Sequence, residues 1–140
     1  MFNKSTILSL FLGSSSLVEG KDGISFVVVG DYANIRDMQR PHAVFDAISQ
    51  MKSEAEPDSA EDFEFFVSTG DNIYSIDEKV PREWELKWMM ELFTTRAPIA
   101  DLPIYPVRGN HESYWNDMDT LVNLTKSYPT WNMPNNYYEQ

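Results

Sequence analysis

The sequence predicts a layered α/β domain. Short apolar runs rich in β-branched and aromatic residues alternate with amphipathic stretches, a pattern typical of strands connected by helices. Apolar residues make up 42% and aromatic residues 14% of the 140 residues, so the chain can bury a core of its own. We therefore expect one domain in which a sheet is layered with helices.

Three segments are predicted to form strands. Residues 24–29 form a nearly continuous apolar run, which is typical of a strand covered on both faces. Residues 63–69 form the second strand, with phenylalanines near its centre. Residues 104–107, which follow Pro103, form the third.

Helices are predicted after these strands. Apolar residues recur at helical spacing over residues 41–51, and a second helix is expected from residue 81. Both segments begin with proline, which is favoured in the first turn of a helix. Trp84 and Trp88 share one face of the second helix, and we expect both to pack in the core. A further helix is expected over residues 116–126.

Residues 1–20 predict a secretory signal peptide. Lys4 supplies a short basic start, residues 7–12 are mostly apolar, and residues 18–20 offer a cleavage site after a run of small residues. The apolar run is too short to span a membrane, and a buried N-terminal helix is the alternative. A signal peptide implies a protein that is secreted or delivered to a lysosome or vacuole.

The net charge restricts the classes of partner. The formal charge is −11 at pH 7, with 22 acidic and 11 basic side chains. A basic stripe is absent from the sequence, which argues against a nucleic-acid partner held by counterion release. Acidity of this kind also serves solubility alone, so the charge identifies no chemistry.

Each predicted strand ends in glycine followed by a short side chain that carries an oxygen donor. These pairs are Gly30-Asp31, Gly70-Asp71 and Gly109-Asn110. Ligands of parallel or mixed α/β sheets bind at the carboxyl ends of the strands, and glycine permits a tight turn there. One such pair is typical of an ordinary turn, but three in succession favour a shared binding site.

Tyr74 and His111 extend this donor set. Tyr74 lies three residues after Asp71, so its phenol oxygen can return to the carboxylate, and His111 directly follows Asn110. Carboxylate, phenolate, amide and imidazole groups together form a donor set for transition metals. A carboxylate that bridges two metal ions suits displacement at phosphorus. We therefore expect Asp31, Asp71, Tyr74 and Asn110 to be metal ligands.

These four ligands make up about half of a two-metal site. Two ions with about five or six ligands each need more donors, which proteins usually supply as histidine. His42 is the only histidine besides His111, and we expect it to be a surface or half-buried residue near a helix start. The remaining ligands are therefore expected in chain beyond Gln140.

The three strand-end blocks resemble the first three signature blocks of the calcineurin-like metallophosphoesterases. The blocks are Gly30-Asp31, Gly70-Asp71-Asn72-Ile73-Tyr74 and Gly109-Asn110-His111-Glu112. Tyr74 after Gly-Asp-Asn resembles the purple acid phosphatase branch, and residues 131–138 are similar to the small tartrate-resistant type. Tyr32 stands where that type usually has tryptophan, and we expect this change to alter the pocket wall. Glu112 is expected to cap or support the site rather than to bind metal.

The resemblance implies a mixed β-sheet sandwich flanked by helices, of which this chain is an incomplete part. Residues 21–140 would be the N-terminal part of the domain, truncated before two later blocks that supply histidine ligands. Asp31 and Tyr74 would bind Fe(III), and Asp71 would bridge both metal ions. Asn110 would bind the second ion, which is Fe(II), Zn or Mn. His111 would be catalytic, contacting the phosphate and assisting the leaving group.

The resemblance further implies hydrolysis of small phosphate monoesters by this binuclear centre, an activity that needs the missing half of the domain. Two alternatives remain open at this point. One is a calcineurin-like phosphodiesterase, and the other is a non-catalytic truncated paralogue. The oligomeric state is not predicted.

Overall fold

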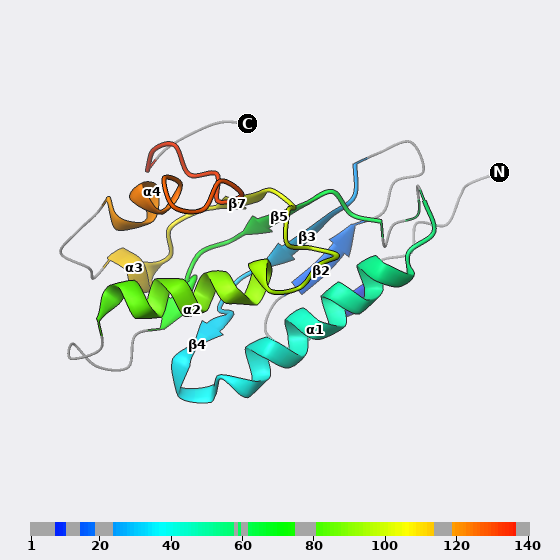
Figure 1. Cartoon of the computed structure of the whole chain (residues 1–140), viewed down its shortest axis with the longest axis horizontal. Helices are drawn as coiled ribbons and strands as arrows, with labels where there is room; N and C mark the ends of the chain where they lie inside the picture. The colour runs from blue at the N-terminus through cyan, green and yellow to red at the C-terminus, as the bar shows by residue number, and fades with distance from the viewer. Residues whose placement is uncertain are drawn as a thin grey trace.

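The computed structural model describes residues 8–10, 15–18, 24–57, 59, 62–74, 81–113 and 119–136. A central sheet is covered on one side by the two longest helices, which lie below it in the view of Figure 1. The helices are α1 (Gln39–Glu54) and α2 (Arg82–Thr94). The predicted α/β class is therefore confirmed.

The central sheet has five strands in the order β1-β2-β3-β5-β7. They are β1 (Leu8–Leu10), β2 (Ser15–Val18), β3 (Phe26–Val29), β5 (Phe65–Ser68) and β7 (Ile104–Pro106). Strands β3, β5 and β7 are parallel, whereas β1 and β2 pair antiparallel to each other and β2 to β3. The sheet is thus mixed, and its parallel part holds the three predicted strands.

The two faces of the parallel strands are buried to different degrees. Val27, Val29 and Phe66 are buried under the helices, whereas the residues between them are only half-buried. On that second face Phe26 stacks on Phe65 with ring centroids 5.1 Å apart. In the described part of the chain, the strand expected to be covered on both faces is buried on one face and half-buried on the other.

Aromatic rings fill the space between the helices and the sheet. The ring centroids of Phe45 in α1 and Phe93 in α2 lie 4.6 Å apart, and both rings contact Phe66 of β5. Edge-to-face and offset contacts of this kind stabilise a core beyond the burial of apolar area alone. Helix α1 begins two residues before Pro41, and α2 begins directly after Pro81, as the two prolines predict.

The two predicted core tryptophans differ in burial. Trp88 is buried, but Trp84 is 46% exposed, so the expectation is wrong for Trp84. The buried residues of α2 begin at Glu85, because the helix meets the core only after its first residues. The helix expected over residues 116–126 is also shorter, with α4 (Thr120–Leu124) inside it and residues 114–118 outside the described part.

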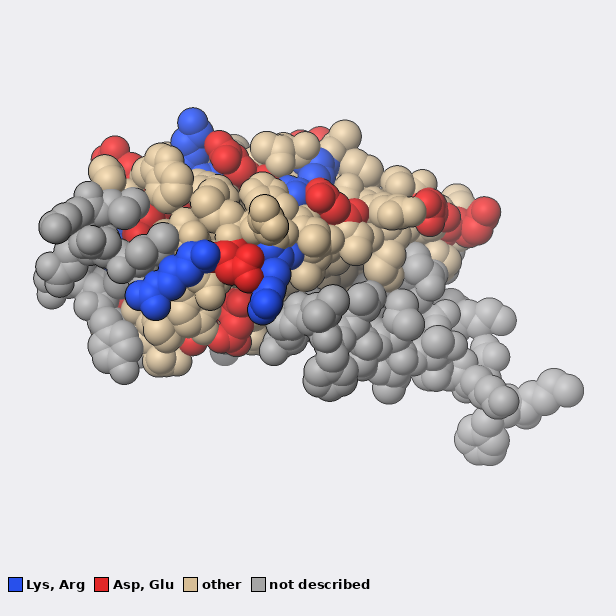
Figure 2. Space-filling view, turned by 90° about the horizontal axis from the view of Figure 1, so that it is seen from below, with Lys and Arg blue, Asp and Glu red and all other residues tan. Residues whose placement is uncertain are grey.

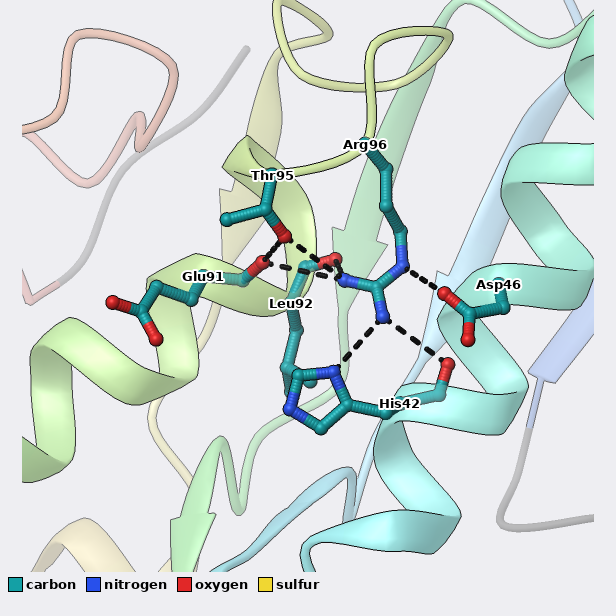
Figure 3. Close-up of polar contacts among 6 residues, drawn as sticks. All are labelled: His42, Asp46, Glu91, Leu92, Thr95 and Arg96. Atoms are coloured by element: carbon teal, nitrogen blue, oxygen red, sulfur yellow. Dashed lines mark hydrogen bonds and ion pairs between the residues drawn. The ribbon is translucent and has the colours of Figure 1, made fainter.

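Arg96 joins α1 to the carboxyl end of α2 (Figure 3). Its guanidinium donates to the carbonyl of Leu92 at 2.8 Å and to the carbonyl of His42 at 3.2 Å, and it lies 3.0 Å from Nδ1 of His42. Its Nε donates to Asp46 at 2.8 Å. Carbonyl groups at a helix end lack partners within the helix, so Arg96 both caps α2 and fixes it against α1. His42 is half-buried in this contact, as expected.

Short elements complete the described structure. Strands β4 (Ala33–Asn34) and β6 (Ile73–Tyr74) form a second, parallel pair, which the sequence pattern did not predict. The 3₁₀ helix η1 (Ile35–Asp37) follows β4, and α3 (Asn110–Ser113) follows β7. Trp131 is buried beside β7 and donates its indole N–H to the carbonyl of Leu121 at 3.0 Å.

Basic and acidic side chains lie near one another on the surface. Figure 2 shows one face, on which the described lysines and arginines are interspersed with aspartates and glutamates. Arg40 and Asp37 form an exposed ion pair at 2.8 Å. Within the described part of the chain, no helix has both the length and the apolar character that crossing a bilayer requires.

Candidate metal centre

The three glycine-containing strand ends lie at one edge of the sheet. Val29 of β3 pairs with Ser68 of β5, and Ser68 pairs with Pro106 of β7, so the three parallel strands end together. The amide of Asp31 donates to the carbonyl of Gly70 at 3.4 Å, which ties the first strand end to the second. This edge is the one at which ligands bind in open α/β sheets.

Two of the glycines are required by close packing between strand ends. Gly70 has a φ of 103°, and a Cβ added there would lie 2.7 Å from Cα of Gly109. A Cβ at Gly109 would lie 2.0 Å from both the amide nitrogen and Oδ1 of Asp71. The repeated glycine in the sequence therefore has a steric cause, because a larger residue would push the strand ends apart.

Asp31 and Asp71 both adopt left-handed backbone conformations, with φ values of 54° and 47°. This region is uncommon for residues other than glycine, although aspartate tolerates it better than most. Such conformations concentrate at functional sites, where the surrounding structure holds them in place. The same unusual geometry at two neighbouring strand ends brings both carboxylates to the sheet edge.

Tyr74 joins the two carboxylates. Its hydroxyl donates to Oδ2 of Asp71 at 3.1 Å and also contacts Oδ1 of Asp31. The pairing of β6 with β4 explains this position, because it places Tyr74 beside the chain that follows Asp31. Three oxygen-bearing side chains from two strand ends therefore meet at one point.

The environment of Tyr74 favours its protonated form. Burial raises the pKa of Tyr74 above its usual value, and the hydrogen bonds to Asp31 and Asp71 and their negative charges raise it further. The phenol proton thus offsets part of the repulsion between two carboxylates that would otherwise face each other. A cation among these oxygens would replace that proton, so the cluster has the charge and the donor type that a metal ion requires.

The third strand end contributes His111 and Asn110. The backbone amide of His111 donates to Oδ1 of Asp71 at 2.9 Å, and its ring lies 4.2 Å from the ring of Tyr74. Asn110 is exposed at the start of α3, between His111 and the glycine that packs against Asp71. The structure therefore brings Asp31, Asp71 and Tyr74 into direct contact, with His111 against them and Asn110 adjacent.

Glu112 supports the site from inside the protein. Its side chain is buried, and its two carboxylate oxygens accept hydrogen bonds from the amides of Ile73 at 3.0 Å and Gly109 at 2.7 Å. Burial raises the pKa of Glu112, whereas these backbone hydrogen bonds lower it in part. Glu112 thus links the second strand end to the third, in the supporting role expected for it.

The described residues do not by themselves form a metal site. Among them, no group of three or more histidine, aspartate and glutamate side chains lies close enough to hold a metal ion. The two carboxylates and one phenol of Asp31, Asp71 and Tyr74 fit a cation that prefers oxygen ligands, but they leave its coordination incomplete. His42 does not contribute, because it is held by Arg96 between α1 and α2.

Asn72 is a buried residue whose contacts the sequence did not reveal. Its Oδ1 accepts hydrogen bonds from the hydroxyl of Tyr32 at 3.1 Å and from the hydroxyl of Ser68, and its Nδ2 donates to the carbonyl of Val107 at 2.9 Å. Tyr32 is buried and packs against the rings of Phe45 and Phe93. Tyr32 lies 40 residues and Val107 lies 35 residues from Asn72 in the sequence, and Ser68 lies on the other side of a turn. No local sequence pattern indicates such contacts.

The described structure is a mixed α/β sheet with carboxylate and phenol oxygens gathered at its strand ends. The sequence profile described as calcineurin-like phosphoesterase matches residues 24–140, and the chain belongs to this family. Membership of the family implies divalent metal ions as cofactors.

One protein with a similar sequence is an acid phosphatase. Tartrate-resistant acid phosphatase type 5 of Mus musculus is 27% identical over 124 residues, an alignment that covers 82% of this chain and 34% of that protein. The chain thus spans about a third of the length of this relative. The similarity agrees with the resemblance found in the strand-end blocks.

Proposed function

We propose that this chain is the N-terminal part of a phosphatase that hydrolyses small phosphate monoesters at a two-metal centre. The observation that carries the proposal is the contact of Tyr74 with both Asp31 and Asp71. The similarity to an acid phosphatase favours monoesters over diesters. A phenol between two carboxylates also distinguishes this donor set from one made of carboxylates and histidines alone.

The proposed ligands divide between two ions. Asp31 and Tyr74 would hold Fe(III), Asp71 would bridge, and Asn110 would hold Fe(II), Zn or Mn. When bound, such a pair of ions lowers the pKa of a coordinated water and offsets the charge that develops on the phosphate oxygens. Asp71 suits the bridging position because each of its oxygens already faces a different neighbour, Tyr74 on one side and His111 on the other.

His111 is the proposed catalytic side chain of this part of the chain. Its imidazole lies beside Tyr74 and is only partly buried, so a phosphate at the edge of the sheet could reach it. From there it would contact a phosphate oxygen and pass a proton to the leaving alcohol. Its backbone amide meanwhile holds Asp71, so one residue serves both the substrate and a ligand.

We propose that the remaining metal ligands come from another part of the protein. The described side chains provide two carboxylates and a phenol where two ions need about ten or more ligands in total, including waters and substrate. Histidines from residues beyond Gln140 would supply the balance. We further propose that residues 1–20 direct the protein to a secretory, lysosomal or vacuolar destination.

The proposed function is tested with the full-length protein encoded by the gene, in the wild-type form and as Asp71→Asn. Metal content is measured together with hydrolysis of p-nitrophenyl phosphate and of bis(p-nitrophenyl) phosphate. Asp101→Asn, which changes an exposed aspartate elsewhere, is the matched control. We expect the wild type and the control to hold metal and to prefer the monoester, and Asp71→Asn to lose both metal and activity.

Two other results would replace the proposal. A preference for the diester would identify a phosphodiesterase. A gene that encodes no histidine blocks, together with a wild-type protein that neither binds metal nor hydrolyses either ester, would identify a non-catalytic relative. Equal metal content and activity in the wild type and Asp71→Asn would show that Asp71 is not a bridging ligand.

A further inference from the structure

We propose that Asn72 is a positioning residue, whose buried amide holds the three strand ends in the arrangement that brings the proposed metal ligands together. The expected effect of Asn72 on metal binding rests on the proposed function. Its expected effect on the arrangement of the strand ends does not. Among the described residues, the side chain of Asn72 bonds to Tyr32, Ser68 and Val107 and not to the proposed ligand side chains, so it would act through the backbone.

The amide of Asn72 is fully buried, and both of its ends are engaged. Oδ1 accepts from the hydroxyls of Tyr32 and Ser68, and Nδ2 donates to the carbonyl of Val107. Two donors at one end and an acceptor at the other leave a single orientation of the amide that satisfies every partner. A buried polar network of this kind favours one arrangement, because any other leaves a polar group without a partner.

Each contact of Asn72 reaches a different strand end. Tyr32 directly follows Asp31, Asn72 itself directly follows Asp71, and Val107 lies three residues before Asn110. One side chain therefore ties together the three segments that carry the proposed ligands. Glu112 makes a second connection, but it joins only the second and third segments.

The position of Asn72 also explains how Asp71 can keep its left-handed backbone. Gly70 and Asp71, which both have positive φ values, form the turn between Ser68 and Asn72. Strained turns persist only where neighbouring contacts hold them. The bond from Ser68 before the turn to Asn72 after it closes the turn, and the bond to Val107 anchors it to β7.

A purely structural role for this network predicts a different outcome from a positioning role. Loss of a buried hydrogen bond lowers stability wherever it occurs. Only a positioning role also disturbs the contact between the amide of His111 and Asp71 at temperatures where the variant remains folded. That contact lies outside the network, so it serves as the local readout.

The test uses the full-length protein with Tyr32→Phe, which removes one hydroxyl and keeps the ring, and with Asn72→Asp, which removes the Nδ2 donor. Ser68→Ala is the additional variant, since it removes the other donor to Oδ1. Two matched controls lie away from the site, Tyr128→Phe and Asn132→Asp, the latter removing a bond from Nδ2 to the carbonyl of Thr130 at 2.8 Å. Hydrogen exchange at the amide of His111 and the affinity for Mn²⁺ alone are measured well below each melting temperature.

We expect the network variants to exchange the His111 amide faster than wild type and to bind Mn²⁺ about tenfold more weakly, whereas the controls match wild type. Unchanged exchange and affinity in the folded network variants would overturn the proposal, even if their melting temperatures fall. If wild type itself binds no Mn²⁺, the proposed function fails, but faster His111 exchange confined to the network variants would still support positioning.

Discussion

The backbone amide of His111 donates a hydrogen bond to Oδ1 of Asp71 at 2.9 Å, so the third strand end holds a side chain of the second. Tyr74 holds the other oxygen of the same carboxylate at 3.1 Å. The carboxylate of Asp71 therefore has a fixed orientation before any ion binds. Preorganised ligands of this kind lower the cost of binding, because less freedom is lost on association.

The first prediction concerns Gly109. Alanine there would place a methyl group 2.0 Å from the backbone and carboxylate of Asp71, so the two strand ends would have to separate. We expect Gly109→Ala to destabilise the protein by about 3 kcal/mol, measured by urea unfolding. Gly30→Ala is the comparison, because its added methyl group meets the hydroxyl of Thr69, a side chain that can rotate away. An equal loss in the two variants would contradict the packing account.

The second prediction concerns Glu112 and pH. Burial raises its pKa in the folded state, so the folded protein holds this proton at pH values where the unfolded chain has released it. The free energy of unfolding should therefore fall as the pH rises above the ordinary glutamate value of 4.5. Glu112→Gln removes this contribution, and urea unfolding between pH 4 and pH 7 with a chelator present compares the two slopes. A wild type that loses no more stability than Glu112→Gln across that range would contradict the prediction.

The third prediction concerns the contact between α1 and α2. Arg96 is nearly buried and donates to carbonyl groups of both helices, so Arg96→Met removes the hydrogen bonds to the carbonyls of Leu92 and His42. We expect this variant to lose about 2 kcal/mol of stability. Arg40→Met breaks an exposed ion pair with Asp37 and should change stability by less than about 0.5 kcal/mol. Similar losses in both variants would show that the hydrogen bonds of Arg96 to the helix carbonyls contribute little.

The fourth prediction concerns the N-terminus. If residues 1–20 form a signal peptide, N-terminal sequencing of the secreted protein will begin at residue 21. Strand β2 pairs with β3 in the structure, so cleavage would leave β3 as the edge strand next to β5. A mature protein that retains residues 15–18 would instead keep the five-stranded sheet and contradict the signal peptide.

The sequence predicts the parts of the fold that depend on local chemistry. The strand over residues 24–29 and the glycine-containing strand ends are visible because apolar runs and close packing leave local signatures. The contact of Tyr74 with Asp71 could also be predicted, because the two residues are only three positions apart in the sequence. The helix starts follow from Pro41 and Pro81 for the same reason.

Features that depend on distant partners could not be predicted in this way. The hydroxyl of Tyr32 donates to Asn72, forty residues later in the chain, a contact that no local pattern indicates. Trp84 shares a helix face with Trp88, yet its burial depends on where α2 meets the core. The pairing of β4 with β6 involves two residues on each side, too few to leave a pattern.

The most direct test of the proposed centre is the visible spectrum of the full-length protein loaded with Fe(III), compared with Tyr74→Phe. Phenylalanine keeps the ring beside His111 and removes only the oxygen that contacts Asp31 and Asp71. We predict a charge-transfer band from iron-bound tyrosinate in the wild type and its loss in the variant. Iron binding without such a band, or a band that persists in Tyr74→Phe, would contradict the assignment of Tyr74 as a metal ligand.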